Sequence, residues 1–343
     1  AACGWYNKLL PFMFEPLNSY TELLLPDDLL STNSIISFVN QNLGPEECEN
    51  VEVIGWLYQY YISEKKDEAS KKIQAAKPLQ KREIMAYTQI FTPKWIVKYL
   101  VENSVGRLWL KSNKSSKLDS KMKYLLNKED LTKESSLKVQ SPEDLRLLDP
   151  SAGSGHILVY MFELLMEIYL ESGYYISDIP ELIIKNNLFG LDIDSRAVSL
   201  ASFALMMKAR EYDTKILDKK IIPNIFVLNK TVDPLSEDIF ENKINADIEI
   251  LGSLLRFEHD LFGTEAIDYS LTKDLLLNDR FDSLGSNLKK LNAIFGAKFH
   301  CVVTNPPYLN PGVDRTLKDY VQKKYPVAKY DLFACFIEKC IEW

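Results

Sequence analysis

Two consecutive prolines that follow an apolar segment restrict the fold of this chain more than any other feature. Residues 299–303 read FHCVV, a run typical of a buried strand. Pro306 and Pro307 cannot extend that strand into a sheet, because proline has no N–H to donate to a neighbouring strand. The chain therefore leaves the strand through a rigid turn at its carboxyl end, which is the edge where open α/β sheets bind ligands.

This rigid turn carries the groups that recognise a planar base through its exocyclic amine. Asn305 offers an amide oxygen and Pro306 a carbonyl, so together they can accept two N–H hydrogen bonds. Tyr308 offers an aromatic face, and stacking on a base contributes about 1–3 kcal/mol. Taken alone, the same residues also describe a proline-stiffened turn with an asparagine cap and a core tyrosine.

A loop of small residues is expected at the end of a second strand. The apolar residues 145–148 predict this strand, and residues 157–170 predict a long apolar helix after the loop. Strand, small-residue loop and helix form the nucleoside- and phosphate-binding arrangement of doubly wound folds. The loop departs from the dinucleotide fingerprint, because Leu158 stands where a third glycine is required. Asp149 ends the strand instead, and a carboxylate there suits a cationic ligand better than a pyrophosphate.

A third strand, expected at residues 188–193, also ends in acidic residues. Asp192 can accept hydrogen bonds from both hydroxyls of a ribose, and Ile193 can pack on an adenine ring. Asp194 is expected to cap a helix over residues 196–211. A fourth apolar run, residues 221–228, predicts a further strand.

Residues 1–86 predict a mainly helical region in front of the sheet. Within it, residues 51–62 are apolar on most faces and predict a buried helix. Asp27 and Glu64 belong to segments that imitate the two halves of a metal-dependent nuclease motif. That chemistry needs the second half on a strand, whereas Glu64 lies in an Ala/Lys/Glu-rich stretch that predicts a helix end in solvent.

Thr92 and Pro93 are expected to open an amphipathic helix. Threonine is a good N-cap residue and proline suits the first turn of a helix. The amino end of such a helix could meet a carboxylate or a polar ligand. A well-capped core helix explains the same pattern.

Two stretches, residues 111–141 and 230–297, are expected to be insertions into the sheet framework. The first is rich in Lys and Ser and predicts a mobile surface excursion. The net charge of −7 counts mildly against a complete DNA-binding surface. Candidates for phosphate contact follow the proline turn: Arg315, Lys318, Lys323, Lys324 and Lys329.

The cysteines and histidines argue against a metal site. Five scattered cysteines without CxxC spacing favour a reducing compartment, which we take to be the cytoplasm, and three dispersed histidines do not suggest ligands. No apolar run is long enough to span a membrane. The chain begins without methionine and ends inside an expected helix, so we expect a fragment of a longer protein.

The motifs FTPxxIVxxLV, DPSAGSGH, GLDID and NPPY, in this order, resemble those of the amino-methyltransferases that act on adenine N6 in DNA. Two further segments, IGWLYQYYISEKKDE (54–68) and YPVAKYDLFACFIEKC (325–340), resemble the PglX family of adenine-specific DNA methyltransferases in BREX phage-defence systems. The resemblance implies an α/β fold with a Rossmann-like class I methyltransferase sheet and flanking helices over residues 87–343. The helical region 1–86 would precede this sheet.

The same resemblance implies S-adenosylmethionine as methyl donor, held at three places. Thr92 and Pro93 would contact its methionine part, and Asp149 would face its ammonium group. Asp192 would hold the ribose hydroxyls and Ile193 the adenine ring. The loop that lines the donor would consist of Ser151, Ala152, Gly153 and Gly155.

A flipped-out adenine of double-stranded DNA is the implied methyl acceptor. Asn305 and Pro306 would accept hydrogen bonds from its N6, Pro307 would stiffen the turn, and Tyr308 would stack on the base. The scheme requires no metal. Other proteins of a defence system are further candidate partners, and no membrane association is expected.

Some expected parts of this family have no match in the chain. Its acidic residue after the strand expected at residues 221–228 has only Asn229 and Asp247 as candidates. Three more strands and a target-recognition domain would have to follow NPPY, so we expect an incomplete carboxyl end and weak methylation at best. The alternatives are a catalytically incomplete DNA-binding or scaffold module of a defence complex, and the methylase part of a type IIG restriction enzyme.

Overall fold

The structure is a computed structural model, and it describes most of the chain in several segments. These are residues 2–11, 13–14, 26–29, 31–48, 52–75, 77, 79–90, 92–132, 137–228, 251–256 and 293–343. Most of the expected insertion 230–297 lies outside them, and so do the candidates Asn229 and Asp247. No helix in the described segments is both long and apolar enough to cross a membrane.

The centre of the fold is a parallel sheet of four strands in the order β3-β2-β1-β4. β1 (Leu147–Asp149) pairs with β2 (Leu188–Asp192) on one side and with β4 (Cys301–Val302) on the other, while β3 (Asn224–Val227) pairs with β2. The chain thus winds outward from β1 to β3 and then returns to the other side of β1. Ligands bind at such a switch point, beside the carboxyl ends of the strands. The predicted α/β, Rossmann-like fold is confirmed.

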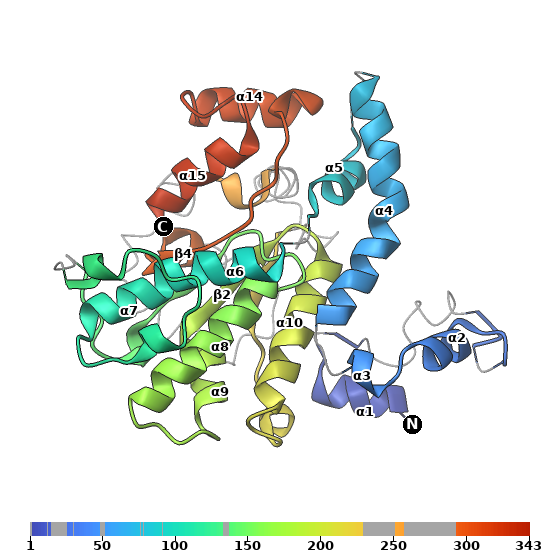
Figure 1. Cartoon of the computed structure of the whole chain (residues 1–343). Helices are drawn as coiled ribbons and strands as arrows, with labels where there is room; N and C mark the ends of the chain where they lie inside the picture. Colours follow the sequence, from blue (N-terminus) through green and yellow to red (C-terminus); the bar gives the residue numbers. More distant parts are fainter. Residues whose placement is uncertain are drawn as a thin grey trace.

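Helices cover both faces of the sheet. Successive strand residues point to opposite faces, so each strand contributes side chains to both of the resulting cores. Leu147 joins a large core with residues of α6, α8 and α10, whereas Leu148 joins a second core with residues of α14 and α15. α8 and α10 run side by side, while α14 and α15 lie apart from them near the carboxyl terminus (Figure 1). These helices are α6 (Lys94–Val101), α8 (His156–Glu171), α10 (Ser195–Arg210), α14 (Arg315–Lys324) and α15 (Leu332–Glu342).

Shorter helical segments connect these elements. They are α7 (Arg107–Ser112), α9 (Ile179–Leu182), the π-helical η2 (Glu102–Gly106) and η6 (Ile183–Asn187), and the 3₁₀ helices η3 (Leu118–Ser120), η4 (Lys128–Thr132), η5 (Pro142–Asp144), η7 (Ile216–Lys219), η8 (Gly252–Leu254) and η9 (Pro311–Val313).

The start of α10 confirms one predicted cap, and the start of α6 contradicts another. Asp194 precedes α10, and its side chain accepts a hydrogen bond from the backbone N–H of Arg196 at 2.9 Å. At α6 the N-cap position belongs to Pro93 and has no side-chain cap. Thr92 lies one residue too early to cap, and its hydroxyl accepts a hydrogen bond from Asn305 instead.

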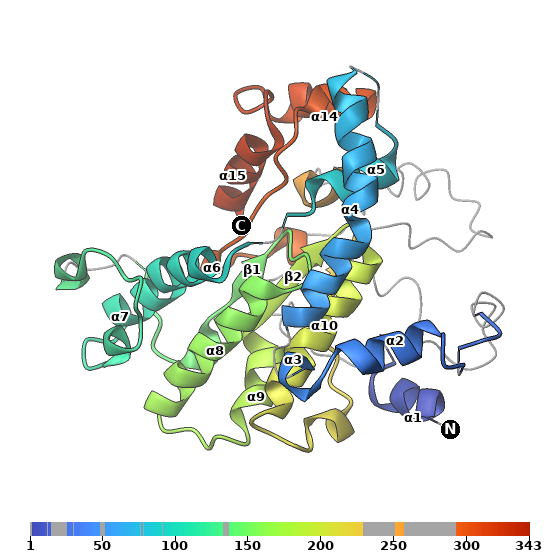
Figure 2. The same cartoon turned by 45° about the vertical axis from the view of Figure 1, so that its right-hand side comes forward.

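The described part of the amino-terminal region is helical, as predicted, but its longest helix is not buried. On α4 the side chains of Trp56, Leu57, Tyr60 and Tyr61 are 48–82% exposed. α4 packs against α5 and, near its amino-terminal end, also contacts α10, while these four side chains remain exposed (Figures 1 and 2). The helices here are α1 (Ala2–Leu9), α2 (Ile35–Asn42), α3 (Pro45–Cys48), α4 (Glu52–Gln74) and α5 (Lys81–Thr88).

The Lys/Ser-rich stretch 111–141 is held to the core in its described part, which corrects the expected mobile excursion. Leu118 and Met122 are 2% and 3% exposed and belong to the larger core. The buried carboxylate of Glu102 accepts hydrogen bonds from the backbone N–H of Tyr124 and from the hydroxyl of Tyr160. Most of the described lysines in this segment are exposed, whereas several of its apolar residues are buried and hold it to the core.

Gly155 is required where the small-residue loop enters α8. Its φ is +87°, and a Cβ at this position would lie 2.9 Å from the Cα and Cβ of Ala201 on α10. Gly173 has nearly the same φ, +88°, but a Cβ there would meet nothing within 4 Å. Alanine substitutions at Gly155 and Gly173 can therefore distinguish the cost of backbone strain from the cost of close packing.

We predict that Gly155→Ala lowers the free energy of unfolding more than Gly173→Ala does. The strained conformation costs both variants about 1–2 kcal/mol, and the clash with α10 adds about 1–3 kcal/mol at Gly155 only. Urea unfolding followed by circular dichroism measures the difference. Equal losses in the two variants would contradict the close approach of the loop to α10.

Candidate functional site

One cavity opens where the strands of the sheet end at the switch point. Asp149 ends β1, Asp192 ends β2, and the turn after β4 contributes Asn305. The structure brings most of the predicted site residues to this cavity: Thr92, Asp149, Ser151, Ala152, Gly153, Asp192, Ile193, Asn305 and Pro307. Four others are not part of its lining: Pro93, Gly155, Pro306 and Tyr308.

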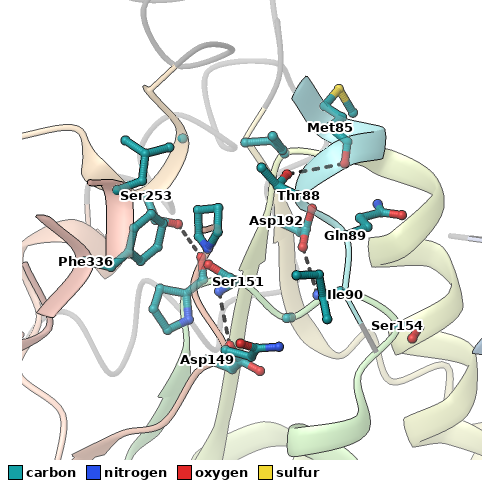
Figure 3. Close-up of a pocket in the computed structure, with 18 of the residues that line it drawn as sticks. Met85, Thr88, Gln89, Ile90, Asp149, Ser151, Ser154, Asp192, Ser253 and Phe336 are labelled. Carbon is teal, nitrogen blue, oxygen red and sulfur yellow. Dashed lines mark hydrogen bonds between the residues drawn. The ribbon is translucent and has the colours of Figure 1, made fainter. Parts of the chain in front are cut away.

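Asp149 presents a buried carboxylate with one unused oxygen. Its Oδ1 accepts a hydrogen bond from the backbone N–H of Ser151 at 3.1 Å (Figure 3). Its Oδ2 is buried and has no hydrogen-bond partner among the described residues. Burial raises the pKa of Asp149 to about 7, and the charge of Asp192 acts in the same direction. The backbone N–H of Ser151 opposes this rise in pKa, and so does the nearby Thr304 hydroxyl, although that hydroxyl is not within hydrogen-bonding geometry of a described group.

Asp192 is held by two backbone amides. Its Oδ2 accepts from the N–H of Gly153 at 2.8 Å, and its Oδ1 accepts from the N–H of Asp194 at 2.9 Å. Burial raises the pKa of Asp192 to about 6, and these backbone hydrogen bonds limit the rise. The site therefore holds two carboxylates on neighbouring strands, whose negative charges a cationic or hydrogen-bond-donating ligand would stabilise.

The Asn305 side chain is held by a hydrogen bond to Thr92, just before α6. Its Nδ2 donates to the hydroxyl of Thr92 at 3.0 Å, which joins the turn after β4 to the start of α6. This bond uses one of the two N–H donors on Nδ2 and leaves the Oδ1 acceptor for another partner. Tyr308 is 49% exposed, and its ring centroid lies 6.0 Å from that of Phe333 on α15.

A wall of the cavity comes from a short segment that the sequence did not mark as functional. Gly252 has a φ of +52°, and a Cβ there would lie 2.7 Å from Cγ2 of Ile193. The Ser253 hydroxyl donates to the carbonyl oxygen of Pro150 at 2.5 Å (Figure 3). The Gly-Ser pair was visible in the sequence, but only its packing on Ile193 and Pro150 assigns it to the site.

The amino-terminal helices provide another wall. Tyr58 of α4 lines the cavity. Met85 and Thr88 of α5 and the following Gln89 line it as well (Figure 3). Leu332 and Phe336 of α15 line it from a third direction. None of these residues carries a local sequence signal, because their roles depend on contacts between distant parts of the chain. Lining residues occur on both sides of the predicted domain boundary between residues 86 and 87, and that division itself stays a prediction.

Residues 186–343 match the family of Eco57I restriction-modification methylases. The chain is 35% identical to the adenine-specific methyltransferase BrxX of Escherichia coli O9:H4 (strain HS), over 98% of this chain and 32% of that protein. It is 33% identical to the adenine-specific methyltransferase PglX of Lacticaseibacillus casei (strain Zhang), over 97% of this chain and 30% of that protein. Among solved structures, a DrdV–DNA complex matches 99% of this chain and 28% of its own, at 13% identity and a TM-score of 0.40.

Residues 186–343 are therefore similar to the Eco57I-type restriction-modification methylases. More particularly, it is a homologue of the BrxX and PglX adenine-specific methyltransferases, which confirms the resemblance to the PglX family. Methyltransferase relatives imply a methyl donor. The chain spans about a third of the length of these two relatives, at 32% and 30%.

The raised pKa values of Asp149 and Asp192 predict a dependence of stability on pH. The folded chain retains their protons up to about pH 7 for Asp149 and about pH 6 for Asp192, whereas the unfolded chain releases them near 3.8. Because the folded state binds more protons in this window, the free energy of unfolding falls as pH rises from about 4 to about 7.

We predict that Asp149→Asn raises the free energy of unfolding at pH 8 by about 1–3 kcal/mol, because each pKa unit corresponds to about 1.4 kcal/mol. Between pH 4 and 7 the variant should lose less stability than the wild type. Urea unfolding at several pH values measures both effects. Asp218→Asn, at an exposed position, is the control and should follow the wild-type profile. Identical profiles for all three proteins would refute the protonated state of Asp149.

Proposed function

We propose that this chain forms the donor-binding and target-base part of a DNA adenine-N6 methyltransferase that uses S-adenosylmethionine. One observation carries the proposal: Asp149, Asp192 and Asn305, distant in sequence, line a single cavity at the switch point of the sheet. The homology to adenine-specific methyltransferases supports this reaction class.

The residues of the cavity suit the donor's distinct chemical groups. Oδ2 of Asp149, buried and without a hydrogen-bond partner in the described part of the chain, is the expected partner of the donor's ammonium group, because a cation would relieve the cost of a buried negative charge. Asp192 keeps a free lone pair on each oxygen beyond its two backbone bonds, so it can accept from the ribose hydroxyls. Ile193 and Gly252 form an apolar wall against which the adenine ring would pack.

The turn after β4 would hold the target base. Asn305 Oδ1 and the Pro306 carbonyl accept hydrogen bonds from the exocyclic N6, which shifts its lone pair out of conjugation with the ring and makes the nitrogen more nucleophilic. Tyr308 is exposed beside this turn and can stack on a flipped-out base. S-adenosylmethionine supplies a methyl group on a positively charged sulfur. The protein's main contribution is then to align nitrogen and methyl carbon, a source of large rate increases.

We further propose double-stranded DNA as the macromolecular substrate, phage defence as the biological setting and the cytoplasm as the compartment. The Arg315 side chain on α14 is 95% exposed and lies 3.8 Å from Oδ2 of Asp319, so a phosphate group would compete with that carboxylate for the guanidinium. The nuclease alternative has no support from the described residues, because Glu64 is exposed on the helix α4 rather than placed on a strand. A catalytically incomplete DNA-binding or scaffold module is the outcome that remains if donor binding fails.

We predict that the chain binds S-adenosylhomocysteine, the demethylated form of the donor, in isothermal titration calorimetry. Asp149→Ala removes the partner of the ammonium group and Asp192→Ala that of the ribose, so each should weaken binding at least tenfold, or about 1.4 kcal/mol. Asp218→Ala, at an exposed position, is the matched control and should bind like the wild type. No heat of binding by the intact chain would refute the proposal and favour the scaffold module.

A further inference from the structure

Two side chains from the amino-terminal helices converge on one carboxylate oxygen beside the cavity. The Tyr58 hydroxyl of α4 donates to Oδ2 of Asp194. Nε2 of Gln89, which follows α5, donates to the same oxygen at 2.8 Å. Burial and the neighbouring Asp194 carboxylate raise the pKa of Tyr58, so its hydroxyl remains protonated and acts as a donor. Hydrogen bonds to a charged acceptor are among the stronger ones in proteins.

Asp194 connects these two donors to Asp192. Its Oδ1 is already used to cap α10 through the N–H of Arg196, so the cap does not require the bonds on Oδ2. Its own backbone N–H donates to Oδ1 of Asp192 at 2.9 Å. Fixing both oxygens of Asp194 therefore fixes the direction of the N–H that orients Asp192. Two hydrogen bonds, joined through the side chain and backbone of Asp194, connect Tyr58 to the carboxylate proposed to hold the ribose.

α4 also packs directly on the small-residue loop. A Cβ on Gly55 would lie 2.7 Å from Cε1 of His156 and 2.9 Å from Oγ of Ser154, so a side chain at this position would have to displace these two groups. The Tyr58 side chain, one turn further along α4, lines the cavity itself. One helix thus contacts the loop after β1 and, through Asp194, the end of β2.

We propose that Tyr58 is a positioning residue for the methyl donor: acting through Asp194, it holds the Asp192 carboxylate in the orientation that receives the ribose hydroxyls. The amino-terminal helices are then a working part of the donor site. This inference rests on the proposed function, since it assigns Tyr58 to a site that binds S-adenosylmethionine. It differs from a purely structural role, in which the Tyr58 hydroxyl would tie α4 to α10 without affecting the ligand.

The first test compares two tyrosines of the same helix. Tyr58→Phe removes only the hydroxyl that reaches Asp194, while Tyr60→Phe removes a hydroxyl from a side chain that is 82% exposed. We expect Tyr58→Phe to raise the dissociation constant for S-adenosylhomocysteine by about 5- to 20-fold, and Tyr60→Phe to change it less than twofold. Gln89→Ala leaves Tyr58 intact and removes the other donor to Asp194. This second variant should weaken binding by about threefold and keeps the test decisive if Tyr58→Phe folds poorly.

The second test establishes the route by which Tyr58 acts. If the hydroxyl works through Asp192, its removal should cost less than twofold in an Asp192→Ala background, where the acceptor at the end of the route is missing. In an Asp149→Asn background, which alters the opposite end of the donor site, the full effect of Tyr58→Phe should persist. A structural tie alone would give the same effect in both backgrounds.

The outcomes are distinct. Wild-type affinity in both Tyr58→Phe and Gln89→Ala, or an equal loss in the Asp192→Ala and Asp149→Asn backgrounds, overturns the positioning role and leaves the proposed function intact. Failure of the unmodified chain to bind S-adenosylhomocysteine overturns the proposed function and this inference together. If Tyr58→Phe weakens binding in the wild type and in the Asp149→Asn background, but has no further effect in the Asp192→Ala background, both the proposed function and this inference are supported.

Discussion

The parallel pairing of β1 with strands on both its sides is the constraint on which the rest of the structure depends. Pairing Asp149 with Gly190 of β2 places Asp192 just beyond it along the same edge. On the other side, the N–H of Val303 donates to the carbonyl of Leu148 at 2.9 Å, so the rigid turn that holds Asn305 begins at that edge as well. Hydrogen bonding between three strands thus brings Asp149, Asp192 and Asn305 to one edge of the sheet.

This arrangement places two carboxylates where water reaches them poorly. Burial raises the pKa of Asp149 to about 7 and that of Asp192 to about 6, so the free protein holds them at a cost in stability near neutral pH. A core optimised only for stability would not retain an Asp149 oxygen that has no hydrogen-bond partner among the residues that the structure describes. The same cost favours a cationic ligand, because binding would supply the missing opposite charge.

The cavity is completed by parts of the chain that lie far from the strands in sequence. Tyr58 and Gln89 reach Asp194 from the amino-terminal helices, and Gly252 packs on Ile193 from the middle of the chain. Arg256, just after that segment, pairs with Glu338 of α15, which connects this wall to the carboxyl-terminal helix. The site is therefore an assembly of the whole described chain rather than a property of its sheet.

Local sequence determined the strands, the small-residue loop, the Asp194 cap and the proline turn, because each depends on backbone preferences within a few residues. Because the parallel strands of a doubly wound sheet have their carboxyl ends at the same edge, these features were sufficient to expect Asp149, Asp192 and Asn305 there. Tertiary structure alone decided that Thr92 pairs with Asn305 instead of capping α6, that α4 exposes Trp56, and that Tyr58 closes the cavity. Such contacts join residues far apart in sequence, and no local pattern records which surfaces the folded chain brings together.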